Sequence, residues 1–303
     1  GNRTTAVRWA RILQDLGHRV DISEESDGDG ADMMIAVHAW RSAGSIRTFS
    51  TRHPDKPLIV LLAGTDIYSF QRSHPEDTLN SMDRATRLVC LHDLVHRAIP
   101  KKYGKKLRII HQSSPALTTP LQPSKRWFEV CVAGHLREEK DSLRTAYAAR
   151  LAPPESNLRV IHLGKAHEDS WARNARAEMA ENPRFVWRGE VPGWKVRRQF
   201  ARSHAMVISS IMEGGANIVS EAIVCGVPVI ASNIDGNIGL LGADYEGYYA
   251  AKDEAALAAL LLRAENEPAF LKTLARQCRA KKPLFTQAKE KAAWKALLKE
   301  IGN

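Results

Sequence analysis

The sequence is poor in cysteine. It has four cysteines in 303 residues, and no two of them form a C-x-x-C pair. This spacing excludes the common structural zinc motifs and gives no disulfide framework. The four are Cys90, Cys131, Cys225 and Cys278, and three of them stand in apolar or helical contexts typical of buried thiols. Such thiols indicate a reducing compartment, so we expect a cytoplasmic protein.

Long apolar runs are also missing. No segment approaches the ~20 consecutive apolar residues that a helix needs to cross a bilayer, so we expect no membrane partner. Hydrophobic residues make up 44% of the chain and charged residues 26%, which is typical of a globular protein. The length of 303 residues allows two domains of ordinary size, each with its own core.

Nucleic-acid-binding motifs are absent as well, although the formal net charge is +10. The basic residues are scattered, with small clusters at residues 101–106 and 197–198. A site for a diphosphate and an anionic co-substrate would also raise the charge, and many basic side chains are merely solvated. We therefore expect no nucleic-acid partner. A non-catalytic protein that binds nucleic acid or a nucleotide sugar is the alternative from another class.

The first part of the chain alternates helix and strand patterns. Apolar spacing over residues 6–16, closed by Gly17, predicts an amphipathic helix, and residues 20–22 are expected to form a short strand. Apolar runs that end in polar residues then predict buried parallel strands within residues 33–38, 57–66, 88–92 and 107–112. Ligands bind beyond the carboxyl ends of such strands, which places His38, Thr65 and Asp66 at the rim.

A two-proline stretch at residues 117–124 predicts an extended linker, after which the alternation begins again. We expect a strand and loop over residues 128–136, further strands at residues 158–164, 185–187 and 205–208, and helices at residues 141–151, 172–180 and 196–203. Alanine-rich and leucine-rich helices follow Tyr248, the last of them over residues 288–298. The chain is thus predicted to be an α/β protein with two Rossmann-like domains.

Residues 205–231 carry the clearest functional pattern. They predict a strand, a Gly-Gly loop, a helix that begins near Ala216 or Asn217, and a second strand. A glycine loop that leads into a helix N-terminus presents free amides to an anion. The carboxylates of Glu213 and Glu221 would repel a phosphate alone, but they suit a ligand that also carries hydroxyls, such as a nucleotide sugar. The alternative is an ordinary turn with two surface glutamates.

Glu213 and Glu221, followed by Cys225-Gly226 and Pro228, resemble the E-x7-E signature of retaining GT-B glycosyltransferases. The match departs from the common pattern at residues 215–217, where Gly-Ala-Asn replaces Phe-Gly-Leu. Residues 212–217 and 236–242 resemble a narrower group, the selenosugar synthases of selenoneine biosynthesis.

This resemblance implies a GT-B fold, in which two Rossmann-like domains face a central cleft. Residues 1–120 would form the acceptor domain and residues 121–285 the nucleotide-sugar domain, while residues 286–303 would form a helix that crosses back to the first domain. It also implies that a first strand precedes Gly1, so that residues 1–5, with Asn2 and Arg3, belong to a loop facing the cleft. A frayed helix cap is the alternative for these residues.

The resemblance also assigns roles in donor binding. It places Glu221 on the ribose hydroxyls and Glu213 on the donor sugar, and the amides of residues 214–217 on the sugar and diphosphate. The four residues are Gly214, Gly215, Ala216 and Asn217. Lys140 matches the lysine that faces the diphosphate, whereas His135 stands where an arginine is usual, so Arg137 is expected to share that role. A solvated surface position is the alternative for Arg137 and Lys140.

Three further assignments are less specific. His38 matches the histidine that faces the donor sugar, although a histidine at a strand end is more often structural when judged from composition alone. Residues 187–191, including Arg188, are expected to contact the base, with Trp187 as plain core as the alternative. Arg3 and Arg41 could meet an anionic acceptor, and Arg41 could equally lie on a helix surface.

The implied reaction uses a UDP-sugar, taken to be UDP-N-acetylglucosamine, and selenophosphate, and forms a 1-seleno sugar with release of UDP and phosphate. Fixed positive charge and loop amides can stabilise the leaving diphosphate. The sequence shows no D-x-D carboxylate pair suited to Mg²⁺, so we expect no metal and no cofactor. A GT-B enzyme that glycosylates a hydroxyl or thiol is the alternative. The oligomeric state stays open.

Overall fold

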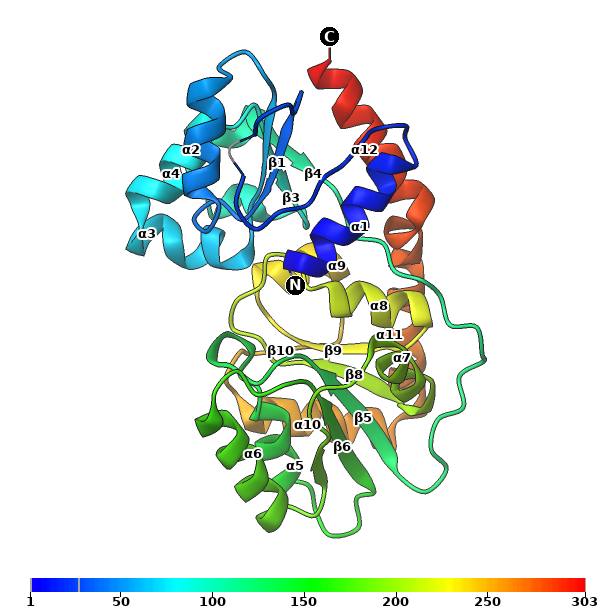
Figure 1. Cartoon of the computed structure of the whole chain (residues 1–303). Coiled ribbons are helices and arrows are strands. Elements are labelled where there is room, and N and C mark those ends of the chain that lie inside the picture. Colours follow the sequence, from blue (N-terminus) through cyan, green and yellow to red (C-terminus); the bar gives the residue numbers. More distant parts are fainter. Residues whose placement is uncertain (1, 27, 303) are drawn as a thin grey trace. The chain divides into compact units, whose positions relative to one another are not determined.

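The computed structural model describes residues 2–26 and 28–302. The chain divides into two compact units (Figure 1). Unit 1 comprises the chain up to Gln112, the loop Glu213–Gly215 and the segment from Gln287 onward. Unit 2 comprises Ser113–Met212 and Ala216–Thr286. The divisions fall after Gln112 and Thr286, and the loop Glu213–Gly215 is grouped with unit 1 although it lies within residues 121–285.

Unit 1 contains a four-stranded parallel sheet in the order β1-β2-β3-β4. Its strands are β1 (Met34–Val37), β2 (Leu58–Leu61), β3 (Arg87–Cys90) and β4 (Leu107–Ile109). Its helices are α1 (Asn2–Gln14), α2 (Ala43–Arg52), η1 (Asp66–Phe70), α3 (Gln71–Ser73), α4 (Pro75–Arg84), η2 (Val95–Arg97), η3 (Lys101–Lys106) and α12 (Gln287–Ile301).

The two faces of this sheet build two separate cores. Because successive side chains of a strand point to opposite faces, Leu58 and Val60 of β2 join the core with α2 and α4. Ile59 and Leu61 join the opposite core, to which α1 and α12 contribute. There the rings of Trp9 and Trp294 meet edge to face, with centroids 4.7 Å apart. Burial on both faces explains why the strands read as continuous apolar runs.

Two expectations for the start of the chain are wrong. Residues 20–22 form no strand, because Val20 packs against the core whereas Ile22 is 55% exposed, so the segment buries one side chain only. The segment expected to be a loop is helical from Asn2 onward, as the first turn of α1. Thr5 is buried there and accepts a hydrogen bond from Gln112 Nε2 at 2.8 Å, which fixes this turn. Gly1 lies outside the described residues.

Unit 2 contains a six-stranded parallel sheet in the order β10-β9-β8-β5-β6-β7. Its strands are β5 (Phe128–Ala133), β6 (Leu158–Leu163), β7 (Phe185–Trp187), β8 (Ala205–Ile208), β9 (Val229–Ser232) and β10 (Tyr248–Tyr249). Its longer helices are α5 (Arg144–Arg150), α6 (Asp169–Glu181), α7 (Gly193–Arg202), α8 (Asn217–Cys225), α9 (Asp235–Leu241), α10 (Glu254–Asn266) and α11 (Pro268–Lys281), and η4 (Glu138–Lys140) and η5 (Lys282–Phe285) are single turns.

The strand order of unit 2 reverses between β5 and β8. From β5 the chain moves outward through β6 to β7, and it then returns to β8 on the other side of β5. Helices α5 and α6 cover one face of the sheet, and α7 and α8 cover the other (Figure 1). Open parallel sheets bind ligands at such a reversal, beyond the carboxyl ends of the strands. The segments that follow β5 and β8 are therefore the first place to look for a site.

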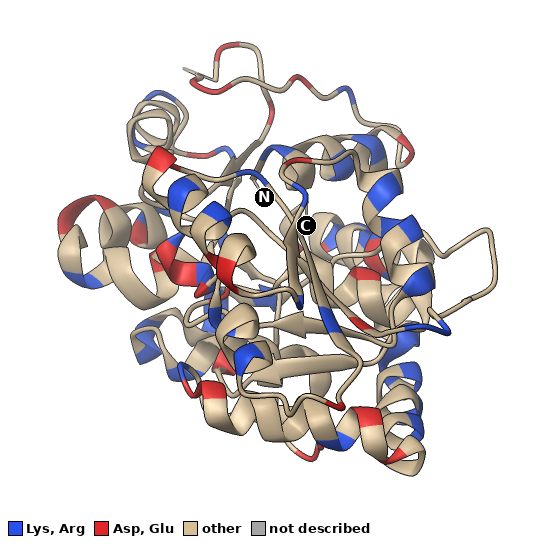
Figure 2. Ribbon diagram, turned by 90° about the horizontal axis from the view of Figure 1, so that it is seen from below, with Lys and Arg blue, Asp and Glu red and all other residues tan. Residues whose placement is uncertain are grey.

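All four cysteines are free and buried, whereas the sequence contexts indicated burial for three of them. Burial raises the pKa of Cys90 to about 12 and that of Cys225 to about 11, so both stay protonated at neutral pH. Among the described residues, no helix is both long and apolar enough to span a bilayer. Lys and Arg are interspersed with Asp and Glu over many helices (Figure 2).

Candidate active site

In unit 2, buried polar groups hold the loop that follows β5 in place. His162 of β6 is 1% exposed, and its Nε2 lies 3.1 Å from the carbonyl oxygen of Gly134. Gly164 approaches the same carbonyl so closely that a Cβ there would lie 1.8 Å from the oxygen. Its φ of +153° is also one that side-chain-bearing residues rarely adopt. Gly134 therefore marks a point where two strand-end loops touch through backbone alone.

Ser142 holds the next turn of this loop. Its Oγ accepts a hydrogen bond from the Arg137 amide at 3.0 Å and lies 3.2 Å from the carbonyl oxygens of His135 and Arg137. His135 lies at the surface, and the desolvation of the covered part of its imidazole lowers its pKa. At neutral pH His135 thus supplies a hydrogen bond rather than a full charge. Fixed positive charge in this loop comes from Arg137 and Lys140.

The segment after β8 is tied to the same loop. Ser209 Oγ lies 3.0 Å from the carbonyl oxygens of both Lys140 and Asp141. The Ile211 amide donates to the Glu139 carbonyl at 2.9 Å. These bonds connect the segment that follows β5 to the segment that follows β8, at the point where the strand order reverses. Lys140 therefore has a fixed backbone next to the start of the segment that leads to α8.

Helix α8 begins at Asn217, as the sequence predicts. The N-cap position holds Ala216, whose methyl group cannot accept a hydrogen bond, so its side chain satisfies none of the first-turn amides. Glu221 lies one turn along the helix, where its Oε1 accepts from Asn217 Nδ2. The helix start thus presents amides with one carboxylate a turn behind them. This arrangement can hold an anion and a hydroxyl-bearing group together.

In unit 1 a buried carboxylate organises the strand ends. Asp66 is 1% exposed and accepts hydrogen bonds from the amides of Ala39 (2.8 Å), Trp40 (3.0 Å) and Ala63 (3.0 Å). Its Oδ1 also lies 2.7 Å from His38 Nδ1. All of its acceptor capacity is used within the protein. Asp66 is therefore placed to hold His38 rather than to contact a substrate.

His38 follows β1 in a strained conformation. Its φ is +106°, which is rare for a residue with a side chain, and its side chain is 2% exposed. The short contact with Asp66 places the imidazole proton on Nδ1, so Nε2 accepts from the Thr65 hydroxyl at 2.9 Å. The Arg41 amide also approaches Nδ1, at 3.3 Å, and this is the weaker contact. The bonds that Asp66 receives from residues 39 and 40 hold the strained turn in place.

The loop Glu213–Gly215 belongs to unit 1 and passes close to two strand-end loops. A Cβ on Gly214 would lie 2.4 Å from the Gly64 nitrogen, and a Cβ on Gly215 would lie 2.5 Å from the Leu91 Cβ. The φ of Gly215 is +105°. Both positions therefore require glycine in this arrangement. Glu213 is 9% exposed.

The candidate residues thus fall into two groups. Unit 1 brings together His38, Thr65, Asp66, Glu213, Gly214 and Gly215. Unit 2 brings together His135, Arg137, Lys140, Ala216, Asn217 and Glu221. Asn2, Arg3 and Arg41 are exposed in unit 1. The Arg188 side chain lies in a groove beside α7, where its Nη1 is 3.4 Å from Gln199 Oε1.

His92 is a polar group of this region that our sequence analysis did not single out. It follows β3, is fully buried, and its Nε2 lies 3.3 Å from the Tyr68 hydroxyl, while Nδ1 accepts from the Leu94 amide. Burial, with His111 and His96 nearby, lowers its pKa to about 4. His92 is therefore neutral at physiological pH. The sequence feature that could have identified His92 is the one that identified His38, namely an apolar run that ends in a polar residue.

Solved structures share this architecture. The chain is similar to Anabaena HepE in complex with UDP and glucose (TM-score 0.74, 16% identity, 89% of this chain and 78% of that one). It is also similar to TarM from S. aureus (0.72, 13%, 98% and 58%) and to the sucrose-phosphate synthase of Thermosynechococcus elongatus (0.69, 15%, 90% and 74%). The molecule therefore has the α/β fold of GT-B glycosyltransferases, with two parallel sheets.

The family to which the chain belongs is identified by a sequence match that lies mostly in unit 2. The model of the family "Glycosyl transferases group 1" matches residues 120–282, which is more than half of the chain. The chain belongs to this family of glycosyltransferases. The match includes both the loop after β5 and the start of α8.

Proposed function

We propose that this protein transfers a sugar from a UDP-sugar, and that unit 2 holds the nucleotide. The observation that carries this proposal is the start of α8, where the N-cap residue Ala216 makes no side-chain bond to the first-turn amides. Glu221 lies one turn further along, and the segment before the helix is bonded to the Lys140 loop. The amides and the charges of Arg137 and Lys140 would hold the diphosphate, and Glu221 would accept from the ribose hydroxyls. Related folds support the choice of base, since HepE was solved with UDP-glucose and the pneumococcal transferase GtfA with UDP and GlcNAc.

The chemistry proposed for this site is departure of UDP from the anomeric carbon. Negative charge builds on the leaving oxygen, and the same amides and cations would stabilise it without reorganising. In unit 1, His38 would orient the donor sugar, with Asp66 as a positioning residue that fixes its tautomer. Glu213 would face the sugar.

We further propose that the donor is UDP-N-acetylglucosamine and the acceptor selenophosphate. Selenium would form the bond to the anomeric carbon as UDP leaves, and water would then cleave the selenium–phosphorus bond, giving a 1-seleno sugar and phosphate. Support comes from residues 212–217 and 236–242, which resemble selenosugar synthases, and from the exposed Arg3 and Arg41. Transfer to an oxygen or sulfur acceptor is the competing assignment.

Two measurements test these proposals separately. Turnover with a panel of nucleotide sugars, with and without selenophosphate, should release UDP and give a selenium-containing product only when both substrates are present. UDP release that depends on a hydroxyl or thiol acceptor, with no selenium-containing product, would refute the selenium assignment and keep the transferase.

The nucleotide site is tested by Glu221→Ala. Loss of a charged acceptor for the ribose hydroxyls should weaken UDP binding on the order of 10- to 100-fold in calorimetry. Glu155→Ala, at an exposed loop position of the same unit, is the matched control and should bind UDP as the wild type does. Unchanged UDP affinity in Glu221→Ala would remove the nucleotide from the start of α8.

A further inference from the structure

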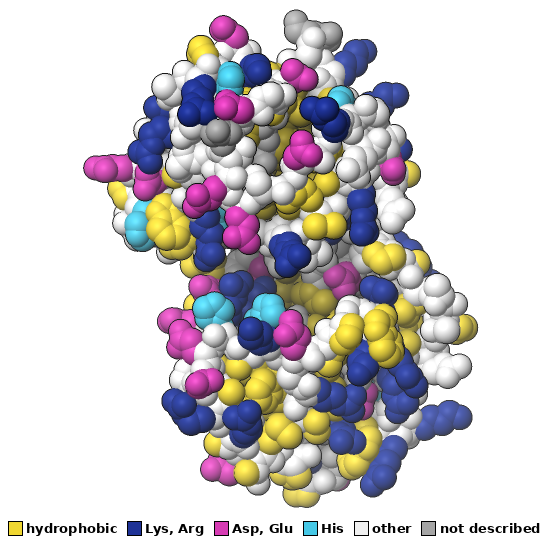
Figure 3. All heavy atoms as spheres, viewed as in Figure 1, with side chains coloured by type: hydrophobic (Ala, Val, Ile, Leu, Met, Phe, Trp, Pro, Cys, Tyr) yellow, Lys and Arg dark blue, Asp and Glu magenta, His cyan; other side chains and the backbone are white. Residues whose placement is uncertain are grey.

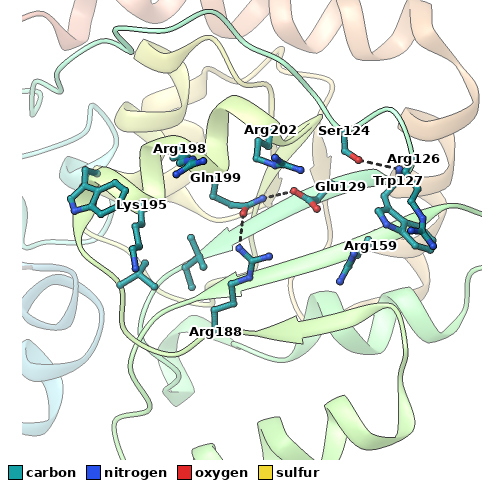
Figure 4. A pocket seen from close by; sticks show the side chains of 13 residues that line it. Ser124, Arg126, Trp127, Glu129, Arg159, Arg188, Lys195, Arg198, Gln199 and Arg202 are labelled. Atoms are coloured by element: carbon teal, nitrogen blue, oxygen red, sulfur yellow. Dashed lines mark hydrogen bonds between the residues drawn. The ribbon is translucent and has the colours of Figure 1, made fainter.

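Unit 2 has a groove beside α7 whose cations, apart from Arg188 of the segment expected to contact the base, have no part in the proposed function. It has a volume of ≈ 650 Å³ and lies between α7 and the strands β5 and β6 (Figure 4). Six cationic side chains line it: Arg126, Arg159, Arg188, Lys195, Arg198 and Arg202. They come from the helix, from β6, and from the segments before β5 and after β7. The groove is therefore basic on several sides.

These cations have almost no compensating charge. Glu129 is the single carboxylate of the lining, it is 5% exposed, and its Oε1 is already engaged by Gln199 Nε2. In the part of the chain that the structure describes, none of the six has a carboxylate oxygen within 4.0 Å, and Arg159 Nε is buried without a hydrogen-bond partner. Some arginines elsewhere in unit 2 are paired with carboxylates, as Arg150 is with Glu178 and Glu181.

An array of this kind costs folding free energy when it is empty. Arg198 and Arg202 stand four residues apart on one helix, a spacing at which like charges repel. A mixed surface with interspersed signs avoids that cost, and the helices of Figure 2 show this mixture elsewhere. The cost indicates that an anion balances the groove. In the space-filling view, Lys and Arg side chains also gather with hydrophobic ones between them at the lower right of unit 2 (Figure 3).

The shape and lining narrow the class of anion. The volume lies in the range of small-molecule sites, and cations on several sides suit a compact ligand with more than one anionic group. Guanidinium groups match phosphate oxygens in pairs, and five of the six cations are arginines. Trp194 at the start of α7 is 53% exposed and offers a ring on which a base could stack. We propose that the groove binds a small molecule with two or more linked phosphates, as in a nucleoside triphosphate, at a second site beyond the proposed donor site.

The test is calorimetric titration of the full chain with inorganic triphosphate and with ATP, in saturating UDP and at about 0.1 M salt. The double variant Arg198→Glu/Arg202→Glu should weaken binding by ~100-fold, since each lost phosphate contact costs roughly tenfold. The matched control is Lys272→Glu/Arg276→Glu, an exposed pair with the same spacing and charge change on α11, which should bind like the wild type. ATP tighter than triphosphate indicates stacking, and equal affinities indicate recognition of phosphate alone.

A second readout guards against misfolding. Without ligand, the groove variant should melt at the wild-type temperature or above it, because repulsion between like charges is removed. Glu221→Ala should leave triphosphate binding intact, which separates this site from the proposed nucleotide site. The proposal is overturned if the wild type does not bind triphosphate, or if both double variants lose affinity equally. It is also overturned if the groove variant loses only the binding of a single-stranded oligonucleotide, because the groove would then belong to nucleic acid.

Discussion

In unit 1 a buried carboxylate at the strand ends bonds to a buried imidazole as well as to backbone amides, whereas in unit 2 the polar groups that support the loop after β5 bond to its backbone. Asp66 fixes the imidazole of His38 and three amides around it. His162, Ser142 and Ser209 instead fix carbonyl groups of the loop at residues 134–141. Unit 1 thus pre-organises a side chain, and unit 2 pre-organises a stretch of main chain whose own side chains stay more exposed.

The difference suits different ligand chemistry. A diphosphate is held well by a row of amides and by flexible cations, so the nucleotide site proposed in unit 2 would need a rigid backbone more than a rigid side chain. The role proposed for His38 would require one tautomer and one direction of its imidazole, and thus a fixed partner for Nδ1. The φ of +106° at His38 is a strained conformation that the surrounding bonds hold in place.

The largest effect should come from Asp66→Asn. The amide cannot accept all four bonds, so buried donors lose their partner, and we expect the free energy of unfolding to fall by about 3 kcal/mol. Because His38 also loses its orientation, turnover should fall on the order of a hundredfold, while UDP affinity stays near wild type. Denaturant unfolding, calorimetry and steady-state kinetics measure the three quantities.

Asp77→Asn is the matched control for this variant. Its side chain is 47% exposed and lies 4.0 Å from Arg47 Nη1, so stability should change by less than about 1 kcal/mol. If Asp66→Asn kept wild-type turnover, the distinction between the two units would fail, because His38 would not depend on its buried partner.

The pH dependence of stability should show what the two units share, because each buries a neutral histidine. Burial lowers the pKa of His162 to about 4 from an ordinary value of 6.5, although its hydrogen bond to the Gly134 carbonyl opposes the shift. Between these values the unfolded chain binds a proton that the folded protein does not. Stability is therefore complete above pH ~6.5 and is lost as the pH falls, by about 1.4 kcal/mol per pH unit and roughly 3 kcal/mol by pH ~4.

His162→Gln keeps a donor for Gly134 but cannot titrate. Urea unfolding from pH 7 to pH 4 should show a shallower loss of stability in this variant than in the wild type. His92→Gln should reduce the slope in unit 1 in the same way, since His92 has the same lowered pKa. Identical slopes in all three proteins would show that neither histidine is kept neutral by the fold.

Much of this arrangement was open to prediction from the sequence. Buried parallel strands give apolar runs, and β7 and β8 begin and end where those runs predict. The start of α8 at Asn217 followed from two glycines and the apolar period after them. The strand predicted at residues 20–22 does not form. Two apolar residues alone cannot show whether a neighbouring strand is available for pairing.

The contacts that hold the site were not open to prediction. Asp66 looked like a ligand-binding group because it follows a strand, and only the structure shows four donors around it. His162 sits inside an apolar run and gives no sign that it supports Gly134, 28 residues away. Such partners depend on strand register, which a single sequence does not state. The groove beside α7 has the same origin, since its cations come from four separate stretches of chain.

The smallest effect is expected for Gly164→Ala, which tests whether the backbone of unit 2 must stay rigid at the Gly134 carbonyl. In Gly164→Ala the new Cβ would meet the Gly134 carbonyl at 1.8 Å, so one of the two loops must move, at a cost of about 2 kcal/mol in the free energy of unfolding. UDP affinity should fall as well, because the displaced loop carries Arg137 and Lys140. Gly17→Ala is the control: its φ is +96°, but nothing lies within 4 Å of the added Cβ, so only the conformational cost of ~1 kcal/mol applies and UDP binding is unchanged. Equal destabilisation with unchanged UDP affinity in both variants would mean that unit 2 tolerates a shifted loop, and that its amides are not held in place for the ligand.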